Sequence, residues 1–274
     1  MVDLHSHTTA SDGTFTPTQL IEEARNRHLS VLAITDHDTF AGYDEACLAL
    51  AARDLELVCG IELSVKLHGK SVHVLGYFPQ GAPDAFRSVI GEIQEARRDR
   101  NDRLIVRLQE LGLAITLAEV RARGRGMTGR PHFAQVLLEK GYVKTIQEAF
   151  DRYLDESAEG YVYRKEPLFA EGVGWIRAGG GIASLAHPVR VKGDVSALLP
   201  ELCAAGLNAI EAFHSDHTTE DTARFLALAV RHSVMVTGGS DFHGDVKPGL
   251  RLGTGRDGNL SIPADLWERL KKLV

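Results

Sequence analysis

The chain lacks the features of disulfide-rich and membrane proteins. It has three cysteines among 274 residues, Cys47, Cys59 and Cys203. They form no C-x-x-C pair and their number is odd, so we expect neither a disulfide framework nor a thiolate zinc site. No stretch approaches the roughly 18 to 20 apolar residues that a membrane-spanning helix needs. The first residues contain neither the basic region nor the apolar segment of a signal peptide. We therefore expect a soluble, cytoplasmic protein without a membrane partner.

An excess of positive charge is also lacking. The 37 acidic residues outnumber the 31 lysines and arginines, which gives a formal net charge of −6. Such a balance argues against a protein that coats nucleic acid through bulk electrostatic attraction. The charge is uneven, however, because nine arginines and four acids lie between Arg97 and Arg130. The sequence thus predicts one basic segment in an acidic protein.

Short apolar runs alternate with helical patterns in the first and last parts of the chain. Thr16, Pro17 and Gln19 form a typical capped helix start, and residues 67–70 predict a hairpin turn. The apolar runs predict strands at 2–4, 31–34, 55–59, 71–77, 182–185, 209–213 and 234–237. Helices are expected after residue 16 and at 44–53, 171–178, 195–205 and 219–232. This alternation is typical of an α/β barrel.

The alternation is interrupted between about residues 81 and 161. Helical patterns follow one another there, at 85–111, 117–123, 131–140 and 145–154, with no strand pattern between them. We predict a barrel formed by residues 1–80 and 162–274, and a helical insertion formed by residues 81–161.

Histidines and carboxylates follow the ends of the apolar runs. His5 and His7 are two residues apart on the first predicted strand, so both rings leave the same face. Side chains at many strand ends can meet if the strands are parallel and surround one mouth, which is where the sites of (β/α) barrels lie. The candidate metal ligands are His5, His7, Asp12, His37, Glu62, His73, His187, Asp241 and His243.

This ligand set predicts a cluster of divalent ions. Nine ligands are too many for one ion that takes about four to six, so two or three ions are expected. Imidazoles and carboxylates without thiolates suit manganese, iron or zinc. Ions roughly 3.5–4 Å apart clamp a phosphoryl group and activate water. We therefore predict phosphoester hydrolysis by a hydroxide that bridges two ions, with no protein nucleophile.

Further basic residues are candidates for substrate binding. Arg97 and Arg100 occupy core positions in the apolar stripe of the helix at 85–111. They point toward the barrel mouth or pack their stems at the helix edge, and the stripe leaves both alternatives open. Arg130 and His132 flank a proline at a helix start, which favours an anion. His214 ends the strand at 209–213 and is expected to contact substrate or a metal ligand.

Six short motifs resemble the polymerase and histidinol phosphatase (PHP) superfamily, in order along the chain. They are Asp3-Leu4-His5-Ser6-His7-Thr8, Ser11-Asp12-Gly13, Thr35-Asp36-His37, Gly60-Ile61-Glu62, Ala186-His187-Pro188 and Ser240-Asp241-Phe242-His243. The resemblance implies a distorted (β/α)7 barrel with three divalent ions, of which manganese is favoured and iron or zinc are alternatives. It assigns His5, His7, Glu62 and Asp241 to the first ion, Glu62, His73 and His187 to the second, and Asp12, His37 and His243 to the third.

Within that superfamily the chain is most similar to bacterial 3′,5′-nucleotide bisphosphatases that also act as 5′→3′ exoribonucleases. The segments that carry this similarity include residues 130–134 and 186–190. The resemblance implies that the 5′-phosphate is anchored while the 3′ ester is hydrolysed, in 3′,5′-bisphosphonucleotides and in short 5′-phosphorylated RNA. No protein partner is implied. The residues expected to bind substrate are Arg97, Arg100, Arg130, His132, Arg190 and His214.

Two other functions stay open at this stage. A histidinol phosphate phosphatase of the same fold would need acidic residues for the substrate amine and would have little use for the basic insertion. A non-catalytic, regulatory metal-binding module would be expected to have lost some ligands, and none of the nine is missing.

Overall fold

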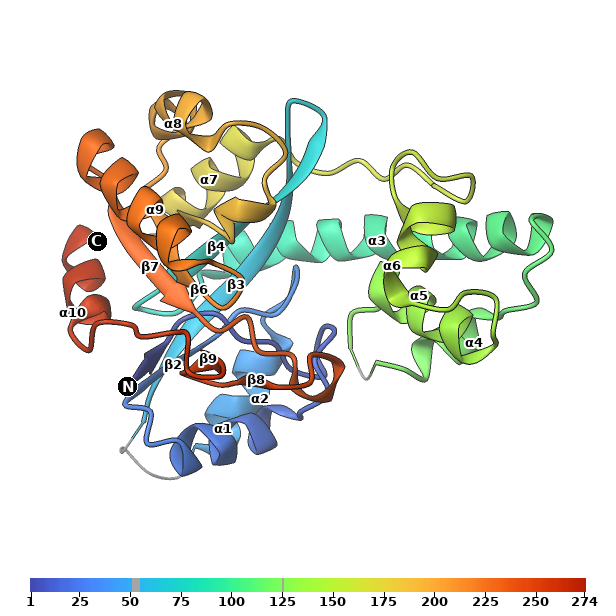
Figure 1. Cartoon of the computed structure of the whole chain (residues 1–274), viewed down its shortest axis with the longest axis horizontal. Coiled ribbons are helices and arrows are strands. Elements are labelled where there is room, and N and C mark those ends of the chain that lie inside the picture. The colour runs from blue at the N-terminus through green and yellow to red at the C-terminus, as the bar shows by residue number, and fades with distance from the viewer. Residues whose placement is uncertain (51–54, 125) are drawn as a thin grey trace.

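A computed structural model describes residues 1–50, 55–124 and 126–274, and contains a nearly closed seven-stranded barrel (Figure 1). The strands follow one another around the sheet in chain order. The first and last strands meet where the N–H of Leu4 donates to the carbonyl of Gly238 at 3.1 Å. This confirms the predicted distorted α/β barrel. The strands are β1 (Val2–Asp3), β2 (Val31–Ile34), β3 (Glu56–Leu67), β4 (Lys70–Phe78), β5 (Ile182–Leu185), β6 (Ala209–His214) and β7 (Met235–Gly239).

One strand runs against the others. β4 is antiparallel to both of its neighbours, whereas β1, β2 and β3 are parallel, as are β5, β6 and β7. The reason is the two-residue turn between β3 and β4, in which His68 and Gly69 have φ values of 48° and 75°, since such a turn joins antiparallel strands. The expectation that every ligand follows a parallel strand end is therefore wrong for Glu62 and His73, which lie within β3 and β4.

Helices surround the barrel wall. The helix start predicted at Thr16 is confirmed. The Thr16 hydroxyl accepts from the N–H of Gln19 at 3.2 Å, and the side chain of Gln19 accepts from the backbone N–H of Thr16. The predicted helix at 44–53 begins earlier, at Ala41, and its residues 51–53 lie outside the described part of the chain. The outer helices are α1 (Pro17–Asn26), α2 (Ala41–Ala49), α7 (Phe169–Ala178), α8 (Val195–Ala204), α9 (Thr219–His232) and α10 (Leu266–Leu270).

Short elements complete the barrel half of the chain. β8 (Leu250–Arg251) and β9 (Gly255–Arg256) form a small antiparallel pair. Single helical turns lie at η2 (Pro188–Arg190), η3 (Gly244–Val246) and η4 (Lys271–Leu273). None of the helices in the described residues has both the length and the apolar composition needed to cross a membrane.

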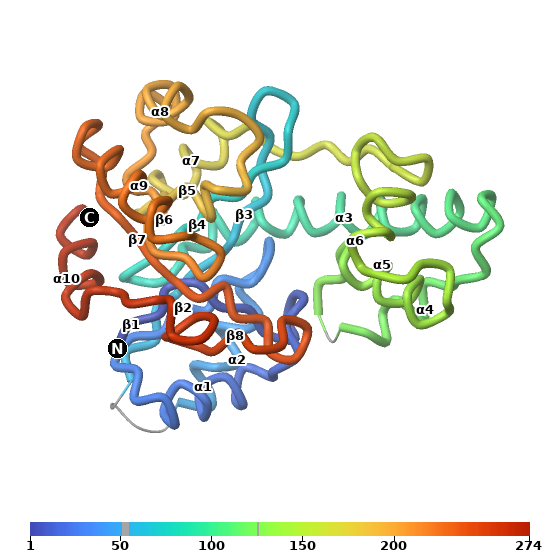
Figure 2. The backbone as a smooth tube through the Cα atoms, viewed as in Figure 1, coloured from blue at the N-terminus to red at the C-terminus, as the bar shows by residue number. Residues whose placement is uncertain are grey.

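The described residues between 81 and 161 are helical and contain no strand. α3 (Asp84–Glu110) extends from the barrel into this region (Figure 2). Its first half packs Ile90 against the barrel core, and its second half packs Leu104 and Leu108 into a separate cluster with Phe133. The other elements are α4 (Leu117–Arg121), α5 (Arg130–Glu139), α6 (Ile146–Ala149) and the π-helical turn η1 (Phe150–Leu154). One long helix therefore connects two hydrophobic cores.

Candidate metal centre

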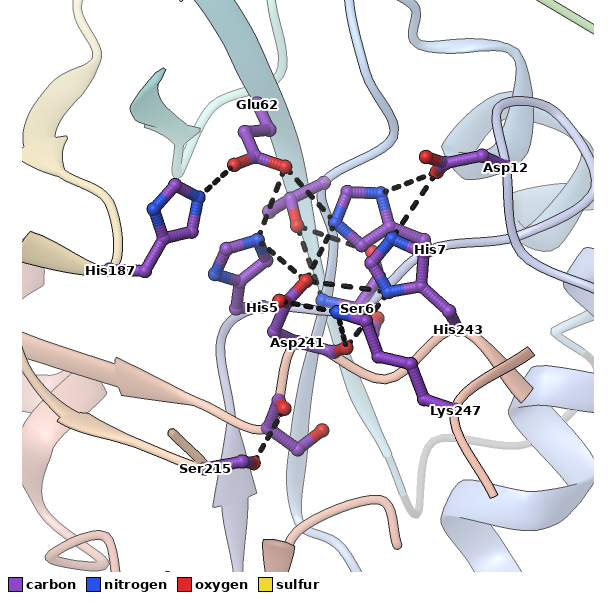
Figure 3. Close-up of polar contacts among 12 residues, drawn as sticks. His5, Ser6, His7, Asp12, Glu62, His187, Ser215, Asp241, His243 and Lys247 are labelled. Atoms are coloured by element: carbon purple, nitrogen blue, oxygen red, sulfur yellow. Dashed lines mark hydrogen bonds and ion pairs between the residues drawn. The ribbon is translucent and has the colours of Figure 1, made fainter. Parts of the chain in front are cut away.

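Five imidazoles surround the buried carboxylate of Glu62 (Figure 3 shows part of this arrangement). Its Oε2 lies 3.3 Å from Nε2 of His5, 3.1 Å from Nε2 of His7 and 3.2 Å from Nδ1 of His37. Its Oε1 lies 2.8 Å from both Nδ1 of His73 and Nε2 of His187. The carboxylate thus faces two separate groups of ring nitrogens.

Asp241 and Asp12 complete the cluster. Oδ1 of Asp241 lies 3.4 Å from Nε2 of His7 and 3.3 Å from Nδ1 of His243. Oδ1 of Asp12 lies 3.3 Å from Nε2 of His243, and its Oδ2 lies 3.7 Å from Nε2 of His37. With these contacts the structure brings together all nine side chains that the sequence singles out as ligands.

The donor set fits divalent ions. Buried ring nitrogens of His5, His7 and His37 face the carboxylates of Glu62 and Asp241 but make no hydrogen bond. An unsatisfied buried polar atom costs about 1–3 kcal/mol. Ligands about 2.1 Å from one ion at tetrahedral or octahedral angles are roughly 3.0–3.4 Å apart, close to the spacings seen here. An ion between these atoms would satisfy both kinds of group.

Protonation favours metal binding at part of the centre, whereas the surrounding carboxylates raise the pKa of His5 and His7, so metal binding must displace protons from these two rings. Burial lowers the pKa of His37 to about 3 and of His187 to about 4, so these rings are neutral near pH 7. Burial alone would raise the pKa of Glu62, but the surrounding histidines outweigh it and hold the pKa well below its ordinary value. Neutral imidazole and ionised carboxylate are the forms that bind metals.

The β3–β4 hairpin connects the centre to a neighbouring pocket. Glu62 and Ser64 share one face of β3, and His73 is paired with Ser64 across the hairpin. Ser71 lies two residues further along the same face of β4. Ser64, Ser71 and His73 line a cavity of about 200 Å³ beside His37. One face of one hairpin therefore runs from the metal centre into this cavity.

Four arginines line that cavity, which we call the arginine pocket: Arg97, Arg100, Arg130 and Arg164. Arg97 donates to the carboxylate of Asp38 and, at 3.1 Å, to Oγ of Ser64. Arg164 donates to Oε1 of Glu166 at 2.7 Å. His132 lines the same pocket. Of the two orientations predicted for Arg97 and Arg100, the structure has the first: both side chains face the barrel mouth and do not pack at the helix edge.

Arg100 stands apart within this pocket. Its side chain is only 5% exposed, and among the described residues it has no carboxylate within ion-pair distance. Burial and the neighbouring guanidinium groups of Arg97, Arg130 and Arg164 hold its pKa well below the ordinary value. A buried cation beside other cations is costly unless an anion joins it. The pocket is therefore suited to a phosphate group.

Arg190 and His214 do not lie in the arginine pocket. Arg190 pairs with Asp216, and its NH2 lies 3.0 Å from Oδ2 of Asp241. Nε2 of His214 lies 3.5 Å from the same oxygen. Arg190 lies in the helical turn that follows β5, and its partners Asp216 and Asp241 follow the ends of β6 and β7. The structure therefore separates Arg190 from the other expected substrate-binding residues Arg97, Arg100, Arg130 and His132, and His214 contacts a candidate ligand.

Several residues of the site were not singled out from the sequence. Glu211 is fully buried and contacts two candidate ligands, His5 and His187. A single carboxylate within the apolar strand 209–213 is the signal that could have revealed it, because buried charges require partners. Lys247 lies 2.6 Å from Oδ2 of Asp241. Arg164 had no such signal, since it lies in an irregular segment between the insertion and α7.

Comparison with known proteins agrees with this site. The family model described as PHP domain matches residues 3–163. The chain is 34% identical to the 3′,5′-nucleoside bisphosphate phosphatase of Chromobacterium violaceum, over 100% of this chain and 97% of that protein. It is 30% identical to a 5′-3′ exoribonuclease of Haemophilus influenzae, over 88% of this chain and 89% of that protein.

Two further proteins similar to this chain are described as other kinds of phosphoesterase. A phosphoribosyl 1,2-cyclic phosphate 1,2-diphosphodiesterase of Eggerthella lenta is 35% identical, over 88% of this chain and 94% of that protein. A solved structure from Bifidobacterium adolescentis, described as a metal-dependent phosphoesterase, superposes with a TM-score of 0.84 at 33% identity, over 98% of this chain and 94% of that one. The motifs, the barrel and these matches lead to one conclusion. The chain belongs to the PHP domain family.

Proposed function

We propose that this protein is a metal-dependent phosphoesterase that removes the 3′-phosphate of 3′,5′-bisphosphonucleotides and cleaves short 5′-phosphorylated RNA. One observation carries the proposal: the arginine pocket opens beside His37 and His73 of the metal centre. A substrate with two phosphates can therefore place one among arginines while the other lies at the metals. The C. violaceum and H. influenzae relatives bear names that match these two substrate classes.

The nine clustered side chains would hold three divalent ions, and we propose manganese. His5, His7, Glu62 and Asp241 would bind the first ion, Glu62, His73 and His187 the second, and Asp12, His37 and His243 the third. When bound, such ions polarise the phosphate oxygens and increase the acidity of water. Iron and zinc suit the same imidazole and carboxylate donors.

The arginine pocket would hold the phosphate that is not cleaved. Arg97, Arg100, Arg130 and His132 come from the insertion, and Arg164 from the segment that follows it. A guanidinium group matches the geometry of phosphate oxygens and keeps its charge at neutral pH. We propose that residues 81–161 form an insertion that binds the substrate phosphate, while residues 1–80 and 162–274 form the barrel that carries the metals.

The hydrolysis itself needs no nucleophile from the chain. A water oxygen forms the new bond to phosphorus, the bond from phosphorus to O3′ breaks, and O3′ leaves with a proton. The arginine pocket fixes the distance of O3′ from the centre, and such positioning lowers the entropic part of the barrier. For histidinol phosphate the pocket is unsuitable, because the substrate amine would lie among four guanidinium groups.

The test is phosphate release by the manganese-loaded protein. Adenosine 3′,5′-bisphosphate, histidinol phosphate and phosphoribosyl 1,2-cyclic phosphate are compared as substrates, together with RNA oligomers that carry a 5′-phosphate or a 5′-hydroxyl. We expect turnover of the bisphosphate and preference for the 5′-phosphorylated RNA. Preference for the cyclic phosphate or for histidinol phosphate would keep the metal centre but overturn the substrate assignment.

A further inference from the structure

A second cavity opens on the metal centre from another side. It has a volume of about 1170 Å³ and reaches the centre at Asp12 and His243, whereas the arginine pocket reaches it at Asp12, His37 and His73. We call it the groove. One wall belongs to barrel loops and contains Thr14 and Lys247, and the other belongs to the insertion and contains Gln135 and Ile146.

The arginine pocket and the groove adjoin each other. Asp12, Pro131 and Phe150 line both of them. The pocket, at about 200 Å³, is smaller than the roughly 300–1,000 Å³ of ordinary small-molecule sites, whereas the groove exceeds that range. The pocket has room for little more than a phosphate group, and the larger part of an extended substrate must lie elsewhere.

Apart from the candidate ligands Asp12 and His243, the groove is lined, among the described residues, by as many carboxylates as cations: Glu139, Asp155 and Asp245 beside Arg123, Arg190 and Lys247. Its cations already have carboxylate partners: Arg123 pairs with Glu139, and both Arg190 and Lys247 pair with Asp241. This arrangement differs from that around Arg100, where a cation has no carboxylate partner among the described residues. The groove therefore offers little attraction to a second highly charged group.

The groove also has an apolar lining. Leu138, Ile146, Phe150 and Val246 contribute to its walls, and Ile146 and Val246 are 38% and 40% exposed. Apolar and aromatic side chains are suited to the flat faces of nucleobases. A neutral, partly apolar groove next to a phosphate-binding centre matches a nucleoside.

We propose that the groove binds the nucleoside on the 3′ side of the cleaved phosphate, and this inference rests on the proposed function. With the 5′-phosphate in the arginine pocket, O3′ of the first nucleotide leads to the phosphorus at the metals. The next nucleoside is attached to that phosphorus and continues beyond the centre, where the groove begins at His243 and Lys247. A bisphosphonucleotide has no group there, so only RNA uses the groove.

The variant Ile146→Glu tests whether the nucleoside on the 3′ side of the cleaved phosphate occupies the groove. Ile146 is the first residue of α6, where a carboxylate is favourable for the helix, so the variant should fold. The matched control is Val230→Glu, because Val230 is an apolar residue on α9 that is 82% exposed and does not line the groove. The substrates are adenosine 3′,5′-bisphosphate and a 5′-phosphorylated adenosine dinucleotide, with thermal melting of each variant as a check on folding.

We expect Ile146→Glu to lower kcat/KM for the dinucleotide about tenfold, mainly through KM, because the carboxylate replaces an apolar contact of the base, and to leave the bisphosphate within about twofold, because it places no base in the groove. Equal losses on both substrates would place the first nucleoside in the groove, and no loss on either would mean that the groove is unused. Both results overturn the inference but not the proposed function. Failure of the unaltered protein to hydrolyse the bisphosphate would instead overturn the proposed function.

Discussion

Glu211 accepts a hydrogen bond from Nδ1 of His5 at 2.9 Å, so that Nε2 of the same ring faces Glu62 and Asp241. The other oxygen of Glu211 accepts from the backbone N–H of His187 at 2.6 Å. One buried carboxylate thus orients two candidate ligands that lie far apart in the sequence. Such contacts set the tautomer of a metal-binding histidine and increase its basicity.

The substitution Glu211→Gln is therefore expected to weaken metal binding. Its amide carries one acceptor oxygen in place of two, so it cannot serve both His5 and His187. Loss of an outer contact of this kind costs about 10- to 100-fold in metal affinity. Titration calorimetry with Mn²⁺ measures the change. The control Glu201→Gln, at an exposed residue that pairs with His68, should bind manganese like the unaltered protein. Equal affinity of both variants would contradict the role of Glu211.

Arg100→Met is expected to stabilise the phosphate-free protein and to weaken binding of the bisphosphate substrate. It removes a buried cation that lies beside Arg97, Arg130 and Arg164, so the phosphate-free protein should melt at a higher temperature. Replacement of buried charges by apolar residues has stabilised other proteins by about 1–4 kcal/mol. The KM for adenosine 3′,5′-bisphosphate should rise about tenfold or more, and the KM for a simple phosphate monoester should change much less.

Arg98→Met is the matched control for this prediction. Arg98 lies on the same helix, half exposed and paired with Glu95. Its loss should change melting temperature and KM only slightly, because exposed ion pairs contribute little. Equal increases of KM for the bisphosphate and the monoester in Arg100→Met would contradict phosphate binding by the arginine pocket.

Metal loading is expected to stabilise the fold. The barrel core is formed by apolar side chains such as Ile61, Leu63 and Val173, so chelation should leave the protein folded. Addition of Mn²⁺ should raise the melting temperature with concentration, because a ligand of the native state stabilises it by mass action. Elemental analysis after dialysis should find about three ions per chain. One ion per chain, or a melting temperature independent of Mn²⁺, would contradict a three-ion centre.

Gly239→Ala is expected to destabilise the closure of the barrel. A Cβ at this position would lie 2.2 Å from Cβ and 2.3 Å from the backbone nitrogen of His5, so β7 and the chain after β1 would have to separate. Overpacking of this kind costs about 1–3 kcal/mol or more. Urea denaturation measures the decrease in the free energy of unfolding. Gly91→Ala at an exposed position of α3, where nothing lies within 4 Å of the added Cβ, should instead increase the free energy of unfolding by about 1 kcal/mol.

Local patterns determined most of the secondary structure. The strands at 31–34 and 182–185 and the helix at 219–232 have the predicted bounds. The short unbroken apolar runs are typical of strands buried on both faces, and the helix combines a capping start with a strong apolar stripe. Eight of the nine candidate ligands lie in the short motifs, which span a few residues each and need no knowledge of distant contacts, and His73 lies outside them in the predicted strand at 71–77.

Only the tertiary structure decided how these residues meet. Gly60 ends an apolar run, yet β3 continues through Glu62 to Leu67 because it pairs with β4. The direction of β4 and the closure of the sheet by Leu4 and Gly238 then set which side chains share the centre. The strand order also places Glu211 behind the ligands, and Arg190 pairs with Asp216 and Asp241 and does not line the arginine pocket. Sequence patterns report periodicity over a few residues. These contacts join segments that are in some cases more than 200 residues apart, and they depend on how the strands pair.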